Sequence, residues 1–480
     1  MAIKKPGGQP FAIGMKKDFI EAPPFRPALN VGCLMDIPTG RYIQGNDGHW
    51  YHTGGLSHVT GIGGRGNTYK SVLAHWMAMM SLDRYWPAEV QSRDTEFSQS
   101  CQRFQDLSQH MPRLSQMDLS NIDNFVITSQ GEESGNVWFK RLSNYLAEKR
   151  AAIKEATFTS PFIDPQSKKP LRLLYPSIIE IDSLSAFTTD VVEAIFEKNE
   201  VGDGAANTVH MRASGAKSQM IMQLPGMAAQ SGGYVIFTAH MGDDIQIDAY
   251  APPPKKLAFL KNKLKFKSVP ENITFLTNNL WVVLNVAVEH TKEHTVTYPK
   301  HSGDNQEGDT DLQRLSIQNL RGKAGPSGLP FDLILSQREG VLVPLSEYHY
   351  LKSHGRFGIG GDNTNFYLEL YPDVKLGRTT LRGLVYSDPL LARAMTITTE
   401  LCQIKSMLPE YTELTVSPKQ LYKNLVEKGY DWNKLLDTRG FWVFKENEAD
   451  NKPFLSTLDL LHLNAGHDDH PWCAAFKVAA

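Results

Sequence analysis

A glycine-rich turn between an apolar run and a helical pattern constrains the fold of this chain more than any other feature. The turn follows Gly61-Ile62-Gly63 and contains Gly64, Arg65, Gly66, Asn67, Thr68, Tyr69, Lys70 and Ser71. These residues match the phosphate-binding pattern G-x-x-x-x-G-K-[ST], except that Tyr69 stands where the pattern has its second glycine. In such a turn, backbone N–H groups at a helix N-terminus hold phosphates, Lys70 reaches the β and γ oxygens, and the Ser71 hydroxyl ligates Mg²⁺. The segment therefore predicts a site for ATP with Mg²⁺, and a chance glycine-rich turn is the simple alternative.

A second apolar strand supplies a carboxylate that such a site needs. Residues 177–183 contain an apolar run that is interrupted by Glu180 and ends at Asp182. Asp182 is placed as the acidic residue that supports Mg²⁺ in P-loop ATPases. A carboxylate at the end of a buried strand can also cap the following helix, and this segment alone leaves both interpretations open.

Two further strands end in polar side chains at the edge of the sheet where ligands bind. Glu96 follows the run 89–93, and it is positioned to orient a water molecule on the γ-phosphate. A solvated acidic pair in a loop, formed with Asp94, is the alternative. His240 follows the run 233–238, so it can sense the γ-phosphate and relay its presence to residues 242–270. Alternatively, His240 is a histidine at a strand end whose ring only forms hydrogen bonds with its neighbours, and this position fits both interpretations equally.

Short β-like runs alternate with longer helical patterns between residues 56 and 340. This alternation is typical of an α/β fold in which helices flank a mainly parallel twisted sheet. The expected core strands are residues 56–62, 89–93, 124–128, 177–181, 234–238, 281–288, 315–319 and 331–335.

The rest of the chain is arranged around this core. We expect an N-terminal arm and lead-in segment over residues 1–55, the ATPase core over 56–340, and an appended C-terminal α+β region over 341–480. That last region contains a helix with Ser417 as N-cap, Pro418 at its first position and Gly429 just past its end. Residues 198–215 and 242–270 are interpreted as loops, and residues 289–312 as a polar insertion.

Composition narrows the class of protein. A chain of 480 residues with 41% hydrophobic and 21% charged residues is globular, which excludes disordered and fibrous classes. Because 50 Lys and Arg balance 52 Asp and Glu, any basic surface must be local. The four cysteines form no CxxC pair, which argues against a zinc ribbon and a disulfide-stapled fold. The longest apolar stretch, residues 280–288, is far short of the roughly 20 residues of a membrane span. We expect a cytoplasmic protein with no membrane partner.

Taken in order, these segments resemble the RecA/UvsX recombinases, and the bacteriophage UvsX branch more closely than bacterial RecA. An aromatic residue such as Tyr69 before Lys-Ser is similar to UvsX-type P-loops. Residues 94–97 are similar to the family's Asp-Ser-Glu-Phe segment, residues 181–184 to its Walker B strand, and His240 to its switch residue. The resemblance covers about residues 50–400. It implies a RecA-like P-loop ATPase core in which Glu96 activates water and Lys70 and His240 act at the γ-phosphate.

The resemblance also implies how DNA and neighbouring subunits are contacted. Arg321 and Lys323 are similar to the family's trans-acting basic pair, which reaches the γ-phosphate of a neighbour; a basic turn between strands is the alternative. Two family loops hold single-stranded DNA, and they correspond here to residues 198–215 and 242–270. Their candidate DNA-binding residues are His210, Arg212, Lys255, Lys256, Lys261, Lys263, Lys265 and Lys267. Lysines of this kind neutralise phosphates without reading bases, and a solvated lysine-rich face is the alternative.

The sequence thus predicts an ATP-dependent DNA recombinase. It is expected to form homo-oligomeric filaments on single-stranded DNA and to promote pairing and strand exchange with homologous duplex DNA. The expected partners are a loader and a single-strand-binding protein. The expected location is the cytoplasm of a phage-infected bacterium. One alternative is a hexameric replicative helicase with a RecA core, which forms rings. Another is a nucleotide-binding filament scaffold without significant hydrolysis, because Tyr69 can narrow the phosphate cradle.

Overall fold

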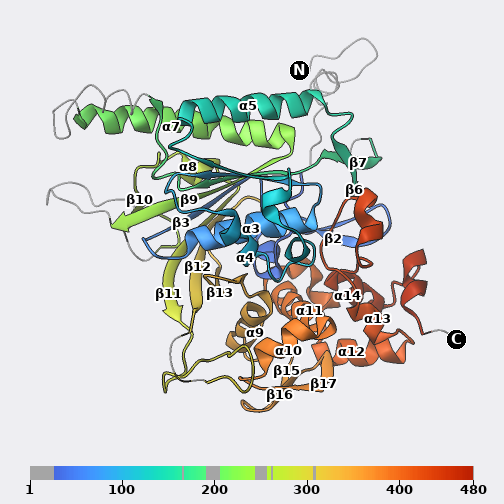
Figure 1. Cartoon of the computed structure of the whole chain (residues 1–480). Coiled ribbons are helices and arrows are strands. Elements are labelled where there is room, and N and C mark those ends of the chain that lie inside the picture. The colour runs from blue at the N-terminus through green and yellow to red at the C-terminus, as the bar shows by residue number, and fades with distance from the viewer. Residues whose placement is uncertain are drawn as a thin grey trace, which may run out of the picture.

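A single large sheet organises the chain (Figure 1). The computed structural model describes residues 26–164, 167–190, 206–243, 257–260, 263–305, 307 and 310–478, with side chains from residue 214 onward in the third range. In spatial order its strands are β14 (Gly340–Val341), β13 (Pro330–Ser336), β12 (Leu312–Gly322), β11 (Asn279–Val288), β3 (Val59–Gly64), β9 (Gly233–Asp243), β8 (Ser177–Asp182), β4 (Glu89–Asp94) and β5 (Phe125–Ser129), while β10 (Leu264–Phe266) pairs with the end of β9.

The sheet is parallel over most of its width. Strands β11, β3, β9, β8, β4 and β5 run parallel to their neighbours, whereas β12, β13, β14 and β10 pair antiparallel. Every residue of β3 and β8 is buried. Strands covered on both faces read as continuous apolar runs. Each of the eight predicted core strands overlaps a strand of this sheet, although residues 56–58 and 124 lie outside β3 and β5. The predicted α/β class, with a mainly parallel sheet flanked by helices and an appended C-terminal region, is confirmed.

Helices cover both faces of the sheet (Figure 1). Helices α3 (Lys70–Arg84) and α4 (Cys101–Leu107) lie on one face, and α5 (Gly135–Ala151), α7 (Ala206–Ser231) and α8 (Ile273–Leu276) lie on the other. Alternate residues of a strand point to opposite faces. Accordingly, Ile178 packs in the cluster with Leu73 of α3, and Ile179 packs in the cluster with Trp138 of α5.

The remaining elements belong to the lead-in segment, a hairpin and the C-terminal region. The lead-in segment contains α2 (Cys33–Asp36), η1 (Ile37–Thr39), β1 (Tyr42–Gln44) and β2 (Trp50–His52), and the hairpin pairs β6 (Thr157–Ile163) with β7 (Pro170–Leu174). Short 3-10 turns η2 (Leu114–Gln116) and η3 (Leu119–Asn121) precede β5. The C-terminal region contains α9 (Val343–Ser353), β15 (Ile359–Gly361), β16 (Phe366–Leu368), β17 (Tyr371–Leu376), α10 (Leu381–Ser387), α11 (Pro389–Met407), η4 (Pro409–Leu414), α12 (Pro418–Glu427), α13 (Trp432–Leu436), η5 (Lys445–Asp450), α14 (Thr457–Ala465) and η6 (Pro471–Phe476).

The lead-in segment packs between the sheet domain and the C-terminal region. Tyr51 of β2 stacks on Phe454 with ring centroids 4.1 Å apart. The Trp442 indole N–H donates to the carbonyl oxygen of Ala28 at 3.1 Å. One hydrophobic cluster includes residues from α3, this segment and α11. The boundaries at residues 55 and 340 remain predictions.

Two stretches interpreted as loops contain regular structure. Residues 206–215 of the first stretch form the beginning of α7. The glycines suggested a loop, but the alanine, methionine and arginine residues of this segment favour a helix. In the second stretch, β10 adds an antiparallel strand to β9. The predicted helix with Ser417 as N-cap is confirmed as α12, because the Ser417 hydroxyl accepts from the Gln420 N–H and Gly429 has a φ of 80°. None of the described helices is both long and apolar enough to cross a bilayer.

Candidate nucleotide-binding site

The glycine-rich turn joins the buried strand β3 to α3 at the carboxyl edge of the parallel strands. Gly64 lies where a Cβ would come within 2.7 Å of the Thr68 hydroxyl oxygen, so the turn closes tightly only on glycine here. Tyr69, the N-cap of α3, has a φ of 57° in the left-handed region. That conformation suits glycine and costs a bulky residue of order 1–3 kcal/mol. Tyr69 therefore keeps the backbone shape that the missing second glycine normally supplies.

Lys70 begins α3 and folds its side chain back over the turn. Its ammonium donates to the carbonyl oxygen of Arg65 at 2.6 Å and to the Thr68 hydroxyl at 3.3 Å. Burial lowers the pKa of this ammonium below its ordinary value, while the charges of Asp182 and Glu96 oppose that shift. A partly desolvated cation that is held against the turn is suited to bind phosphate oxygens.

The Ser71 hydroxyl and the Asp182 carboxylate meet directly beside the turn. Ser71 donates to Asp182 Oδ1 at 3.0 Å, and Thr238 on β9 donates to the same oxygen at 2.5 Å. Asp182 Oδ2 is buried without a hydrogen-bond partner among the described atoms. Hydroxyl and carboxylate oxygens are the ligands that Mg²⁺ prefers, so Ser71 and Asp182 fit a magnesium site.

Glu96 and His240 also lie together at this edge. Glu96 Oε1 accepts from the Ser183 hydroxyl at 2.7 Å and lies 3.2 Å from His240 Nε2. The side chains of Glu96 and His240 are 35% and 40% exposed, so a water molecule can reach both. The structure thus brings Glu96, His240, Lys70, Ser71 and Asp182 to one cavity of about 570 Å³.

A buried acid–base network behind Asp182 was missed by the sequence analysis. Glu180 lies on the face of β8 that is covered by α3. Its Oε1 is 2.5 Å from His75 Nδ1, and its Oε2 accepts from the Ser92 hydroxyl at 2.7 Å. Burial lowers the pKa of His75, but the adjacent Glu180 carboxylate outweighs burial and the net pKa is raised. His75 Nε2 then lies 3.8 Å from Asp182 Oδ2. The interruption of the apolar run by Glu180 was the signal for such a partner.

Arg103 and Gln337 line the same cavity and were also missed. With the Gln337 amide oxygen turned towards Arg103, it accepts from the two terminal guanidinium nitrogens at 3.1 and 3.2 Å. Arg103 comes from α4, and Gln337 follows β13. No sequence motif links two positions so far apart. Together they provide a planar cation and an amide beside the phosphate-binding turn.

Arg321 and Lys323 lie at the opposite, amino edge of the parallel strands. Gly322, between them, pairs with Asn279 at the start of β11. A strand of about five residues, or about 16 Å, separates this edge from the turn. Arg321 donates to the carbonyl oxygen of Thr277 at 3.1 Å, and neither residue lines the cavity of its own chain. These cations can reach a phosphate-binding turn only in another copy.

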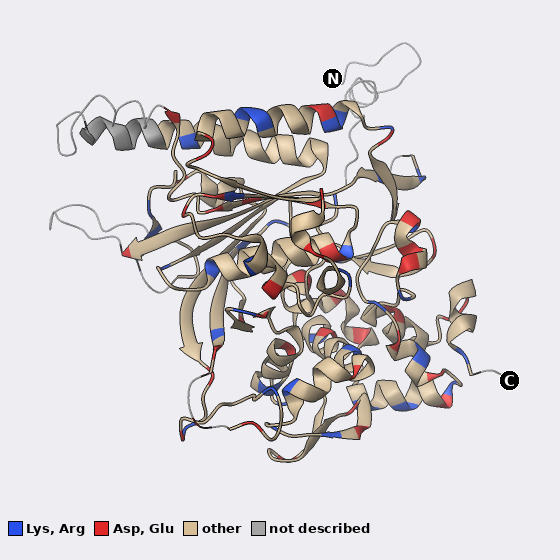
Figure 2. Ribbon diagram, in the orientation of Figure 1, with Lys and Arg blue, Asp and Glu red and all other residues tan. Residues whose placement is uncertain are grey.

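The candidate DNA-binding residues are described only in part. The side chains of His210 and Arg212 and the whole of Lys255, Lys256 and Lys261 lie outside the described residues. Lys263, Lys265 and Lys267 lie on or beside β10 and are exposed, whereas Leu264 between them is buried. Elsewhere on the described chain, Lys and Arg are interspersed with Asp and Glu (Figure 2).

Hydrogen bonds connect these lysines to the phosphate-binding turn. The backbone N–H of Lys267 donates to the carbonyl oxygen of His240 at 2.8 Å. Arg65 in the turn pairs with Asp243, the last residue of β9, at 2.7 Å. Lys217 of α7 donates to carbonyl oxygens of Leu184, Ser185 and Ser268 at 3.0 to 3.1 Å. The turn is thus linked to β9 through Arg65, β9 to the segment after β10 through Lys267, and that segment to α7 through Lys217.

Comparison with known proteins finds a likeness among solved structures, but no protein-family model and no curated protein sequence matches the chain. Among solved structures, the chain is similar to one described as the RadB recombinase, with 14% identity and a TM-score of 0.32. The match covers 60% of this chain and 92% of that one. A TM-score of this size does not establish a common fold, so the fold and site described above stand on the chain's own residues.

Proposed function

We propose that this protein is an ATP-dependent DNA recombinase of the RecA/UvsX class, closest to the UvsX branch. It binds ATP with Mg²⁺, assembles as a filament on single-stranded DNA, and promotes homologous pairing and strand exchange. The observation that carries this proposal is the group of Lys70, Ser71, Asp182, Glu96 and His240 around one cavity. The order of the motifs and the lysine-bearing strand attached to His240 support the DNA-dependent part.

Hydrolysis of ATP is supported by the setting of Glu96. The hydroxyl of Ser183 and the ring of His240 fix one oxygen of its carboxylate, which leaves the second oxygen to orient a water molecule. Lys70 binds the phosphate oxygens, and the Ser71 hydroxyl is held by Asp182 in the position of a magnesium ligand. When bound, Mg²⁺ neutralises charge on the phosphates. Positioning and charge stabilisation of this kind account for most of the catalysis of phosphoryl transfer.

Coupling to DNA is supported by the connection from Glu96 to β10. His240 contacts Glu96 through its ring and accepts from Lys267 through its carbonyl oxygen. A nucleotide that changes the His240 ring position therefore biases the strand that carries Lys263 and Lys265. Release of phosphate is expected to loosen the contact between these lysines and DNA.

Assembly is supported by the separation of the two edges of the sheet. Arg321 and Lys323 are too far from the turn of their own chain, and cations that reach across an interface strongly accelerate phosphoryl transfer. Stacking of copies with the amino edge of one on the carboxyl edge of the next would complete each site. Such a head-to-tail contact builds a helical filament if it does not close and a ring if it does.

Hydrolysis by three proteins tests the enzymatic part of the proposal. ATP hydrolysis is measured with and without single-stranded DNA for the wild type, Lys70→Ala and Glu96→Ala. The wild type should be stimulated by DNA, and both variants should be close to background. Equal rates for the wild type and Glu96→Ala would remove the role of Glu96.

A nucleotide-binding scaffold without significant hydrolysis is the second candidate, and Tyr69 favours it because this bulky residue, with a left-handed backbone, lines the cavity. Binding of ATP by a wild-type protein that hydrolyses none, even with DNA, would select the scaffold.

Electron microscopy with an ATP analogue and single-stranded DNA separates filaments from rings. If the images show closed six-membered rings, the proposed function changes from a recombinase to a replicative helicase. The same sample, supplemented with a loader or a single-strand-binding protein, would report whether such partners act on it.

A further inference from the structure

A buried histidine lies one helical turn beyond Ser71, behind the candidate magnesium site. Ser71 and His75 are four residues apart on α3, so their side chains share one face of the helix. Glu180 and Asp182 are two residues apart on β8, so their side chains point to the same face of the sheet, the one that α3 covers. Helix and strand therefore meet in two polar contacts. Ser71 donates to Asp182 at 3.0 Å, and the His75 ring meets Glu180 one turn further along α3.

The two oxygens of the Asp182 carboxylate have different surroundings. Oδ1 accepts from the hydroxyls of Ser71 and Thr238 at 3.0 and 2.5 Å. Oδ2 is buried without a hydrogen-bond partner among the described atoms, and a buried charged oxygen without a donor is costly. His75 Nε2 lies 3.8 Å from Oδ2. This distance is longer than a hydrogen bond, and a shift of about 1 Å would bring the two atoms to hydrogen-bond distance.

The ring of His75 is held in place from its other side. Its Nδ1 lies 2.5 Å from Glu180 Oε1, and Glu180 Oε2 lies 2.7 Å from the Ser92 hydroxyl oxygen. Phe104 packs against the ring, with centroids 4.5 Å apart. The side chains of His75 and Glu180 are 1% and 0% exposed. Because the ring lies between two carboxylates, a hydrogen on each of its nitrogens is favoured, and Nε2 can donate to Asp182.

Stability alone does not require this charged pair. A buried ion pair can often be replaced by apolar side chains of similar size without loss of stability, because the cost of removing both charges from water offsets their attraction. The neighbours of Glu180 on β8 are Ile179 and Ile181, and both are buried. An apolar pair at positions 75 and 180 would continue this pattern. What sets the polar pair apart is its position behind Asp182.

We propose that His75 is a positioning residue for the magnesium ion of the proposed ATPase. Its Nε2–H donates to Asp182 Oδ2, and Glu180 holds the ring, so that Asp182 keeps Oδ1 towards Ser71. Hydrogen-bond partners that orient a metal ligand typically change metal affinity by about 10- to 100-fold. This role rests on the proposed function, because it takes Ser71 and Asp182 as the residues that hold Mg²⁺.

The test separates binding of the metal from folding of the site. A fluorescent ATP analogue that is hydrolysed slowly is titrated into full-length protein at increasing Mg²⁺ concentrations and, separately, in EDTA. The wild type is compared with the double variant His75→Leu, Glu180→Leu, which removes the pair without leaving a buried charge. Glu180→Gln is the second variant, because it keeps the size of the side chain and removes its charge.

His49→Leu is the matched control. His49 is also buried, and its Nδ1 lies 2.9 Å from an Asp459 oxygen, but it does not line the nucleotide cavity. In the wild type, Mg²⁺ should tighten binding of the analogue. In the double variant, the Mg²⁺ concentration that gives half of this effect should rise about tenfold, while affinity in EDTA is unchanged because Lys70 and the turn are intact. Glu180→Gln should show a smaller rise, and His49→Leu should show none.

An unchanged Mg²⁺ dependence in the double variant would overturn this role and leave the proposed function in place. So would an equal loss of affinity with Mg²⁺ and with EDTA, which would mean that the pair serves only the fold, or an equal rise in His49→Leu. A wild type that binds the analogue no better with Mg²⁺ would instead remove the magnesium site, and the proposed function with it. Should the double variant not fold, Glu180→Gln decides by the same comparison.

Discussion

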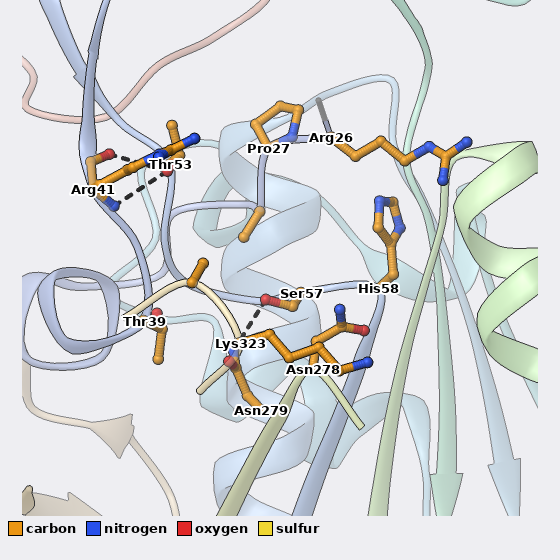
Figure 3. Close-up of a pocket in the computed structure, with 12 residues that line it drawn as sticks. Arg26, Pro27, Thr39, Arg41, Thr53, Ser57, His58, Asn278, Asn279 and Lys323 are labelled. Carbon is orange, nitrogen blue, oxygen red and sulfur yellow. Dashed lines mark hydrogen bonds between the residues drawn. The ribbon is translucent and has the colours of Figure 1, made fainter. Parts of the chain in front are cut away.

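The two edges of the parallel sheet hold their cations in opposite electrostatic settings. At the carboxyl edge, Lys70 lies near Asp182 and Glu96, and Arg65 pairs with Asp243. At the amino edge, Arg26, Arg41 and Lys323 line a cavity that has no carboxylate among its described lining residues (Figure 3). The first edge therefore balances its own charge, whereas the second lacks a counter-charge among the described residues. Under the proposed function, the carboxyl edge carries the chemistry, and the amino edge offers Arg321 and Lys323 to the nucleotide of another copy.

Removing Arg321 and Lys323 should have the largest effect on ATP hydrolysis. Arg321→Ala combined with Lys323→Ala is expected to lower DNA-stimulated ATP hydrolysis by about 10³-fold, because cations in trans contribute that much to phosphoryl transfer. ATP affinity should be unchanged, since neither residue lines the cavity of its own chain. Steady-state hydrolysis and equilibrium binding of a fluorescent ATP analogue measure the two quantities.

The matched control for this double variant is Lys169→Ala with Arg172→Ala, an exposed basic pair beside and on β7. It should hydrolyse ATP at the wild-type rate. An equal loss in both double variants would mean that general charge, rather than the amino edge, supports activity.

Glu96→Gln should have the next largest effect and should act only at the carboxyl edge. Loss of the carboxylate that orients water is expected to lower hydrolysis by at least about 10²-fold, the lower end for a general base. Binding of ATP should persist because Lys70 and Ser71 are intact. Single-turnover hydrolysis separates these two steps. Glu132→Gln is the control, since Glu132 is an exposed glutamate that does not line the cavity; a rate for Glu96→Gln equal to that of the control contradicts the assignment.

Charge reversal on β10 should weaken DNA binding more modestly. Lys263→Glu with Lys265→Glu is expected to reduce affinity for single-stranded DNA at least about tenfold and to flatten the salt slope by about 1.4, for two phosphate contacts. Fluorescence anisotropy at several salt concentrations measures both quantities. Lys140→Glu with Lys154→Glu provides exposed lysines away from β10 as control. Unchanged affinity in the β10 variant would exclude this strand from the DNA site.

The pH dependence of hydrolysis should show the smallest effect. Burial and the Arg321 charge lower the pKa of Lys323, so this lysine loses its charge at a lower pH than an ordinary lysine. Wild-type hydrolysis should fall about twofold when the pH reaches that pKa, because half of the Lys323 side chains are then neutral. Lys323→Arg should move the fall to higher pH, since arginine stays charged. Lys70 is present in both proteins, so identical profiles would show that Lys323 does not act as a cation.

The core strands could be predicted from the sequence because parallel strands are buried on both faces. The run 234–237 is apolar throughout, and the run 177–181 is apolar except for Ser177 and Glu180. Each lies within a core strand. The start of α7 could not be predicted in the same way, because glycine and small residues favour a loop locally while packing of the long helix favours α7. β10 was missed because it has three residues and exists only by pairing with β9.

The local half of the candidate site could also be predicted. The phosphate-binding residues 64–71 are consecutive in the chain, so a sequence motif is enough to recognise them. Arg103 and Gln337 meet only through the fold, and their spacing in the chain gives no signal. The cavity at the amino edge of the sheet is similar, because Arg41 and Lys323, which line it, come from the lead-in segment and the β12–β13 turn. Glu180 is an intermediate case, since a charged residue within an apolar strand indicates a buried partner without naming His75.

A mixing experiment tests most directly whether the two edges belong to one active site shared between copies. Glu96→Gln protein is defective at the carboxyl edge, and the Arg321→Ala, Lys323→Ala protein is defective at the amino edge. In a one-to-one mixture on single-stranded DNA, about a quarter of head-to-tail contacts unite two intact edges. The mixture should recover about that fraction of wild-type ATP hydrolysis, although each protein alone is near background. A mixture as inactive as its components would contradict a shared active site.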